Sequence, residues 1–140
     1  MRKSPVAAAA VVLIFAHLAV RCVLAFGGYF YWDDLILVGR AGTQGLLAPS
    51  YLFDDHDGHV MPAVYAIVWF LQDLGGLDYG VVAVSMLLGQ VALVVSAVLA
   101  FRAVLGHGMG SVVALAVFLL SPIMLPGFTW WSASLTLTPM

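Results

Sequence analysis

Apolar residues are gathered into four long runs along this chain, with short polar stretches between them. The runs cover residues 6–26, 60–77, 80–101 and 111–128. A helix needs about 20 apolar residues to cross the hydrocarbon core of a bilayer, and the first and third runs reach that length. The pattern therefore predicts an all-α fold: a polytopic bundle of three or four transmembrane helices, with residues 1–140 forming one transmembrane region.

The second and fourth runs are irregular. Gln72 and Asp73 interrupt the second run before it reaches residue 77, so we expect either a membrane helix or a shallower, re-entrant one. The fourth run contains Pro122 and Pro126. Because proline removes a backbone donor and clashes with the preceding turn, the end of this helix is expected to be bent or broken.

The first run is interpreted as a membrane helix rather than a secretory signal peptide. His17 and Arg21 interrupt it, and no small-x-small cleavage site follows. Arg21 lies near the end of the helix, where a long cationic side chain is expected to reach out to the interface. His17 lies near mid-span, where packing against a neighbouring helix is expected and a proton relay is the alternative.

Composition supports a membrane protein and excludes two other classes. The chain is 64% hydrophobic and only 9% charged, whereas soluble domains carry about 25% charged residues. Its formal net charge is −2, so it lacks the basic excess of a nucleic-acid-binding protein. We therefore expect neither a soluble globular domain nor a nucleic-acid partner.

The basic residues indicate an orientation. Arg2 and Lys3 precede the first run, and the positive-inside rule then places the N-terminus in the cytoplasm and residues 27–59 outside the plasma membrane. Four strictly alternating spans would put Arg102 outside. A re-entrant second run would return it to the cytoplasm, so the sequence leaves the number of spans open.

Most of the acidic residues of the chain lie within residues 27–59. Seven residues are acidic, and five of them fall in this loop: Asp33, Asp34, Asp54, Asp55 and Asp57. The loop also contains Arg40, His56 and His59, with aromatic residues at both flanks. Since such rings suit the headgroup layer, the loop is expected to lie on the membrane surface.

The adjacent pair Asp33-Asp34 precedes the apolar residues 35–38, which predict a short helix. An aspartate at a helix start can cap unpaired backbone N–H groups and meets the positive end of the helix dipole. A plain cap therefore explains either residue alone. Two adjacent carboxylates exceed what a cap requires, so a functional role remains the other interpretation.

The second acidic cluster, residues 53–59, contains ligand types that suit a divalent metal. A calcium loop with Gly58 at its sixth position would have Phe53 first and Val64 twelfth, and neither side chain supplies oxygen. The calcium loop is therefore excluded, and the absence of glutamate excludes a His-Glu-x-x-His zinc motif. Either a solvated turn or a ligand-binding cluster remains, with no cofactor required and a divalent metal left open.

These elements together resemble the N-terminal part of the GT-C superfamily of polytopic glycosyltransferases. The resemblance rests on four elements: Tyr31-Trp32-Asp33-Asp34 after the first helix, Phe53-Asp54-Asp55-His56, then His59 and Pro62, and Trp130-Trp131 leading to Pro139. The protein mannosyltransferase branch has a similar acidic pair followed by Phe-Asp-x-His-Pro-Pro. Here no proline follows His56 directly, whereas the tryptophan pair is similar to actinobacterial members.

The resemblance implies transfer of a sugar from a polyprenyl-phosphate-linked donor to an acceptor on the external face. It makes Asp33 the general base, with Asp34 as the alternative catalytic residue. It assigns binding of acceptor, donor phosphate or metal to residues of the loop: Arg40, Asp54, Asp55, His56 and His59. The implied partners are membrane lipid and the lipid-linked donor, with other membrane subunits left open.

The chain departs from this family in length and in charge. GT-C enzymes have many more helices, so we expect these residues to be an N-terminal fragment of a larger module, inactive alone. Cations to hold a lipid phosphate are scarce, since only Arg40 and Arg102 lie beyond the first helix. The alternative function is a small non-enzymatic membrane protein, either a transporter fragment or an accessory subunit. A transporter, however, would have its ionisable groups near the bilayer midplane.

Overall fold

The computed structural model describes residues 5–137 and is mostly helical, as the sequence predicted. Its elements, in chain order, are α1 (Pro5–Phe26), α2 (Asp33–Thr43), α3 (Pro49–Leu52), β1 (Asp55–His56), β2 (His59–Val60), α4 (Pro62–Gly75), α5 (Tyr79–Leu105), α6 (Met109–Leu119), η1 (Pro122–Met124), α7 (Pro126–Thr129) and α8 (Trp131–Leu137). The two strands form a small antiparallel hairpin that the sequence analysis did not anticipate.

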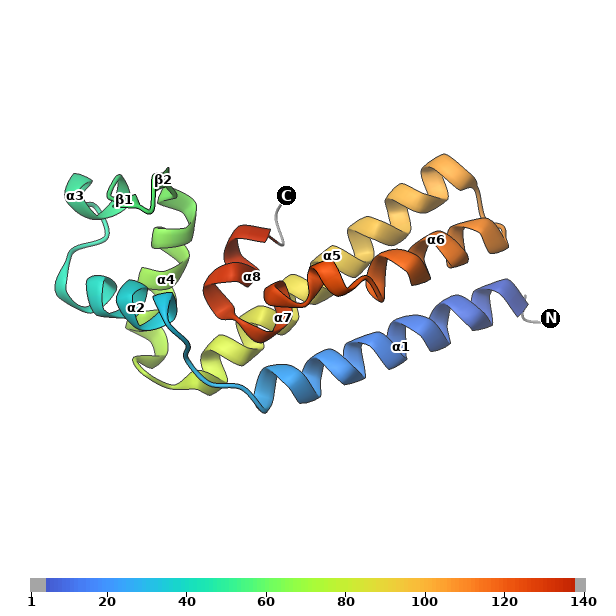
Figure 1. Ribbon diagram of the computed structural model, residues 1–140, viewed down its shortest axis with the longest axis horizontal. Coiled ribbons are helices and arrows are strands. Elements are labelled where there is room, and N and C mark those ends of the chain that lie inside the picture. Colours follow the sequence, from blue (N-terminus) through green and yellow to red (C-terminus); the bar gives the residue numbers. More distant parts are fainter. Residues whose placement is uncertain (1–4, 138–140) are drawn as a thin grey trace.

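Three helices, α1, α5 and α6, lie alongside one another in an elongated bundle (Figure 1). Among residues 5–137, α1 and α5 are the helices long and apolar enough to cross a membrane, with 22 and 27 residues. Only 22% and 33% of their most apolar stretches are buried. Because a core helix of a soluble protein would be mostly buried, this outward-facing apolar surface is compatible with lipid around the bundle.

A second unit, made of α2, α3, the hairpin and α4, lies at the end of the bundle where α1 ends and α5 begins (Figure 1). It has its own apolar core, in which Leu37, Tyr51, Tyr65 and Val68 are fully or almost fully buried. The Tyr51 hydroxyl donates a hydrogen bond to the Tyr65 carbonyl over 2.8 Å. Residues 27–59 are therefore folded against α4 and are not an extended loop.

The second apolar run forms α4, a helix of 14 residues. It is shorter than the roughly 20 residues of a membrane span and packs mainly against α2. The short helix thus belongs to the end unit.

The fourth run is broken at its prolines, as predicted: α6 ends at Leu119, and η1 and α7 begin at Pro122 and Pro126. A break leaves backbone carbonyls without helical partners, which is costly in an apolar environment. Two polar side chains lie against them. Arg21 of α1 donates to the Leu119 carbonyl over 3.3 Å, and Gln90 of α5 lies 3.5 Å from the Gly127 carbonyl.

Arg21 differs from what the sequence suggested. It is buried against the Phe128 ring, with its guanidinium carbon 3.0 Å from the ring centroid, and does not extend to an interface. Trp131 is 1% exposed and packs against Phe30 in the core of the end unit. His17 is buried edge-on to Phe128, as expected for a packed histidine.

Candidate functional site

The helix predicted after the first run begins at Asp33, but neither aspartate caps it in the expected way. The residue before the helix is Trp32, whose φ is 45°, and no side-chain cap hydrogen bond is formed. Instead, one carboxylate oxygen of Asp34 (Oδ2) accepts from the backbone N–H of Tyr31 over 2.9 Å. The carboxylate therefore fixes the turn that leads into α2.

Asp34 also joins two distant parts of the chain. Its other oxygen (Oδ1) accepts from the backbone N–H of Ser132, in the first turn of α8, over 2.8 Å. The side chain is completely buried. Burial raises the pKa of the Asp34 carboxyl, and the hydrogen bonds from Tyr31 and Ser132 oppose this shift only in part. Both oxygens are thus occupied within the protein and shielded from any substrate.

Asp33 has a different environment, although it is the adjacent residue. Its side chain is 18% exposed, and the carboxylate lies 3.7 Å from Nε2 of His56, which is itself 13% exposed. A carboxylate that is partly desolvated and held beside an imidazole has the restricted geometry that proton transfer requires. Of the two candidate catalytic residues, Asp33 is therefore the one that an external molecule can reach.

Arg40 and Asp54 form a second pair on the same side of α2. Arg40 Nη1 lies 2.7 Å from the Asp54 carboxylate and 3.4 Å from the Tyr65 hydroxyl. Asp33 and Arg40 are seven residues apart, close to two helical turns, so they lie on one face of α2. The structure thus brings both acidic clusters together, and we call Asp33, Arg40, Asp54 and His56 the α2 site.

Several residues of the second acidic cluster form and stabilise the turn of the β1–β2 hairpin. Asp57 and Gly58 have φ angles of 51° and 82°, the positive values of a two-residue type I′ turn. The Asp55 carboxylate accepts from the Gly58 N–H over 2.7 Å, which fixes this turn. His59 is paired with His56 across the hairpin and is exposed. The Asp-Gly dipeptide is a hairpin signal that the sequence analysis missed.

Tyr65 and Tyr51 support the site from beneath and were not identified from the sequence. Tyr65 is fully buried and directs its hydroxyl toward Arg40, while its carbonyl accepts from Tyr51. Burial raises the pKa of Tyr51 to about 12, so this hydroxyl remains a hydrogen-bond donor at neutral pH. The sequence does not mark these tyrosines as supports of the site, because isolated tyrosines in an apolar region resemble residues of the membrane interface.

The site is a surface feature, and its residues do not form a metal cluster. Within residues 5–137, no group of three or more His, Cys, Asp or Glu side chains could hold a metal ion. A hollow of about 360 Å³ between α2 and α4 is lined by Ala41, Gly42, Gln44, Trp69, Gln72 and Asp73, none of which belongs to the α2 site. The hollow is therefore separate from the α2 site.

Comparison with family models, curated proteins and solved structures finds no match to this chain.

Proposed function

We propose that this chain acts in a GT-C-type membrane glycosyltransferase that uses a polyprenyl-phosphate-linked sugar donor. The observation that carries the proposal is Asp33, a partly open carboxylate beside His56 where α1 gives way to α2. This is where the sequence resemblance requires a general base. The adjacent Asp34, buried and fully hydrogen-bonded, holds the backbone around it.

In this proposal Asp33 takes the proton from an acceptor hydroxyl. That oxygen forms a bond to the anomeric carbon of the donor as the bond from this carbon to the phosphate oxygen breaks, and lipid phosphate leaves. A positioned base contributes about 10²- to 10⁴-fold to such a reaction. His56 is the positioning residue, because its ring restricts where the carboxylate can lie.

Arg40 is the proposed contact for the donor phosphate. It lies on the same face of α2 as Asp33, about 10 Å away along the helix axis at 1.5 Å per residue. Its long side chain can cover much of that distance. One of its nitrogens (Nη1) is paired with Asp54, which leaves other guanidinium N–H groups of this planar donor for a phosphate.

The membrane placement forms part of the proposal. We propose α1, α5 and the broken α6–α7 segment as three crossings, with α4 on the external surface. Val6 of α1 and Arg102 of α5 then lie at the same, cytoplasmic end, since both line one pocket. The α2 site lies at the other end, where Tyr31 and Trp32 are 60% and 71% exposed and suit a headgroup layer.

The test uses the protein as it is expressed from its own chromosomal gene. Asp33→Asn is introduced into the chromosome, and membranes are given a panel of radiolabelled polyprenyl-phosphate-linked sugars. We expect transfer of one sugar to fall by about 10²- to 10⁴-fold, at an unchanged protein level. Asp57→Asn is the matched control, because Asp57 is exposed in the hairpin turn and asparagine tolerates its positive φ.

Two results would contradict the proposal. One is transfer that is equally fast in Asp33→Asn and wild-type membranes. The other is the absence of transfer from every donor of the panel by wild-type membranes that contain the protein.

The alternative, a small non-enzymatic membrane protein, has one structural observation in its favour. Inside the bundle, His17 Nε2 and Gln90 Oε1 are buried without a hydrogen-bond partner within residues 5–137. Buried polar groups at membrane depth are often functional. If His17→Ala abolished the protein's cellular role while Asp33→Asn and Asp34→Asn had no effect, this alternative would replace the glycosyltransferase.

A further inference from the structure

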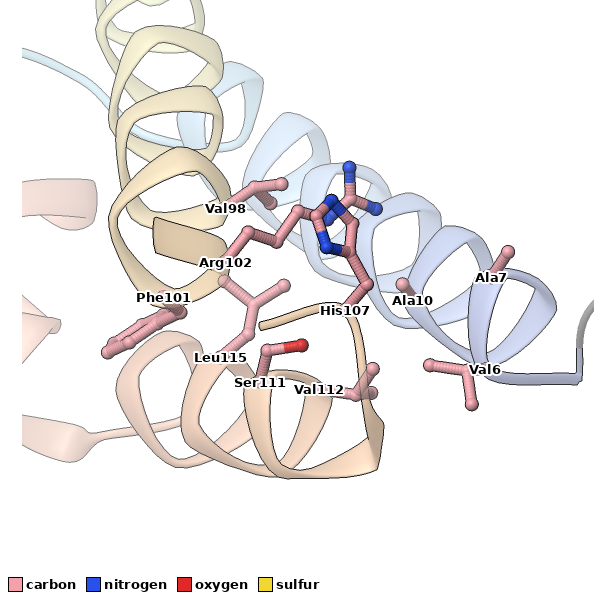
Figure 2. Close-up of a pocket in the computed structure, with 10 residues that line it drawn as sticks. All are labelled: Val6, Ala7, Ala10, Val98, Phe101, Arg102, His107, Ser111, Val112 and Leu115. Carbon is pink, nitrogen blue, oxygen red and sulfur yellow. The ribbon is translucent and has the colours of Figure 1, made fainter. Parts of the chain in front are cut away.

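A pocket of about 210 Å³ lies between α1, α5 and α6, at the end of the bundle away from the α2 site (Figures 1 and 2). Its lining comes from all three helices and the turn between α5 and α6: Val6, Ala7, Ala10, Val98, Phe101, Arg102, His107, Ser111, Val112 and Leu115. No role for this pocket follows from the chemistry of the α2 site.

The polar part of the pocket favours an anion. Arg102 lies in the last turn of α5 and His107 in the turn that follows the helix, and Figure 2 shows both side chains reaching into the space beside α1. Within residues 5–137, neither side chain forms an ion pair with a carboxylate. The third polar residue, Ser111, donates its hydroxyl hydrogen to the Gly108 carbonyl over 2.8 Å. A ligand therefore meets two nitrogen donors and no acidic group from the lining.

The start of α6 adds to this preference. Gly108 precedes the helix and provides no side-chain cap, so the first N–H groups of α6 lack a side-chain acceptor. The space beside Gly108 and Gly110 is open. Unpaired N–H groups at a helix start attract anions, and this helix start directly follows His107 in the chain.

The rest of the lining is apolar, in seven of its ten residues. A free phosphate ion gains nothing from such walls, whereas a phosphate that carries acyl chains gains from burying them there. The small side chains of Ala7 and Ala10 leave space between α1 and the other two helices. The pocket thus combines the nitrogen donors of Arg102 and His107 with walls that are mostly apolar.

We propose that this pocket binds the headgroup phosphate of an anionic phospholipid, with Arg102 and His107 as its contacts. The proposal rests on the membrane placement given above, which puts the pocket at the cytoplasmic leaflet. Basic pockets between membrane helices on that side are suited to acidic lipids. It does not require that the α2 site transfers sugar.

The experiment measures lipid binding to the purified full chain in detergent by native mass spectrometry, with no sugar donor present. Phosphatidylglycerol is compared with phosphatidylcholine and with inorganic phosphate. We expect phosphatidylglycerol to bind most tightly, and Arg102→Gln to weaken it about ten- to a hundredfold, as expected for loss of a charge-assisted hydrogen bond. His107→Gln should weaken it in the same direction.

Two further variants distinguish lipid binding in the pocket from non-specific electrostatic attraction of the lipid to the protein. Ala10→Leu fills the cavity without changing charge and should also weaken phosphatidylglycerol. Asp57→Asn changes the charge by one unit at the other end of the bundle, in the exposed hairpin turn, and should leave binding unchanged. Unchanged binding in Arg102→Gln, or equal binding of inorganic phosphate or phosphatidylcholine, would overturn the proposal. A change in Asp57→Asn as large as that in Arg102→Gln would indicate general electrostatic attraction and likewise overturn it.

Discussion

Asp33 and Asp34 are adjacent residues with opposite environments, because each step along a helix rotates the side chain by about 100°. Asp33 points toward His56 at the surface, whereas Asp34 is directed into the protein, toward the start of α8. Asp34 therefore supports the backbone, whereas Asp33 is the residue to which the proposed function gives proton transfer. From the sequence alone the two could not be distinguished, since the partner of Asp34 is 98 residues away.

These different environments predict unequal losses of stability from two alanine substitutions. Asp34→Ala leaves the N–H groups of Tyr31 and Ser132 without their acceptor, and should lower the free energy of unfolding by about 1–3 kcal/mol at pH 4. Asp33→Ala, the matched control, should change it by less than about 0.5 kcal/mol, as for most surface substitutions. Denaturant titration in detergent measures both, and equal losses would contradict the assignment.

The cost of Asp34→Ala should also depend on pH. Because burial raises the Asp34 pKa in the folded protein, the folded state retains this proton at pH values where the unfolded chain releases it, above about 3.9. Its stabilising contribution is therefore complete below that value and is lost as the pH rises through the folded pKa. The stability difference between wild type and Asp34→Ala should shrink as the pH rises from 4 toward 8.

At the scale of elements, the apolar runs predicted some features well and others not at all. The first and third runs became α1 and α5, and the prolines broke the fourth run where expected, because these outcomes depend on local composition and backbone chemistry. The packing of residues 54–56 against α2 was not predicted. It depends on the contacts of Arg40 with Asp54 and of Asp33 with His56, which are far apart in the sequence, and hydrophobic periodicity does not identify such pairs.

The hairpin provides a test at this scale. Gly58 has φ of 82°, a value that strains any other residue except asparagine and aspartate. Gly58→Val should therefore destabilise the end unit by about 1–2 kcal/mol and loosen the contacts of Asp54 and His56 with α2. Gly39→Ala is the control, because Gly39 lies within α2 with open space for a methyl group. It should stabilise the protein by up to about 1 kcal/mol.

Both variants can be compared by thermal unfolding in detergent. If Gly58→Val unfolded at the same temperature as wild type, the hairpin would contribute nothing to holding the α2 site. A lower unfolding temperature in Gly58→Val, together with an unchanged or higher one in Gly39→Ala, would support the turn as the element that positions His56.

For the whole molecule, the proposed membrane placement has three crossings, and the alternative has four. The location of the α5–α6 turn distinguishes the two arrangements. If α4 spans the membrane, this turn lies outside the cell, and if α4 lies on the surface, the turn lies inside. The shortness of α4 and its packing on α2 favour three crossings. The shared pocket of Val6 and Arg102 requires the start of α1 and the end of α5 to lie on one side.

Single cysteines test this arrangement with a membrane-impermeant maleimide. Cys22, the single cysteine of the chain, is exposed on the apolar helix α1 and should stay unlabelled in lipid, since the thiolate is the reactive form. Asp57→Cys should be labelled in intact cells, and Gly108→Cys only after the membrane is opened. Labelling of Gly108→Cys in intact cells would establish a fourth crossing. It would also separate Arg102 from the cytoplasmic leaflet and remove the basis for a lipid site there.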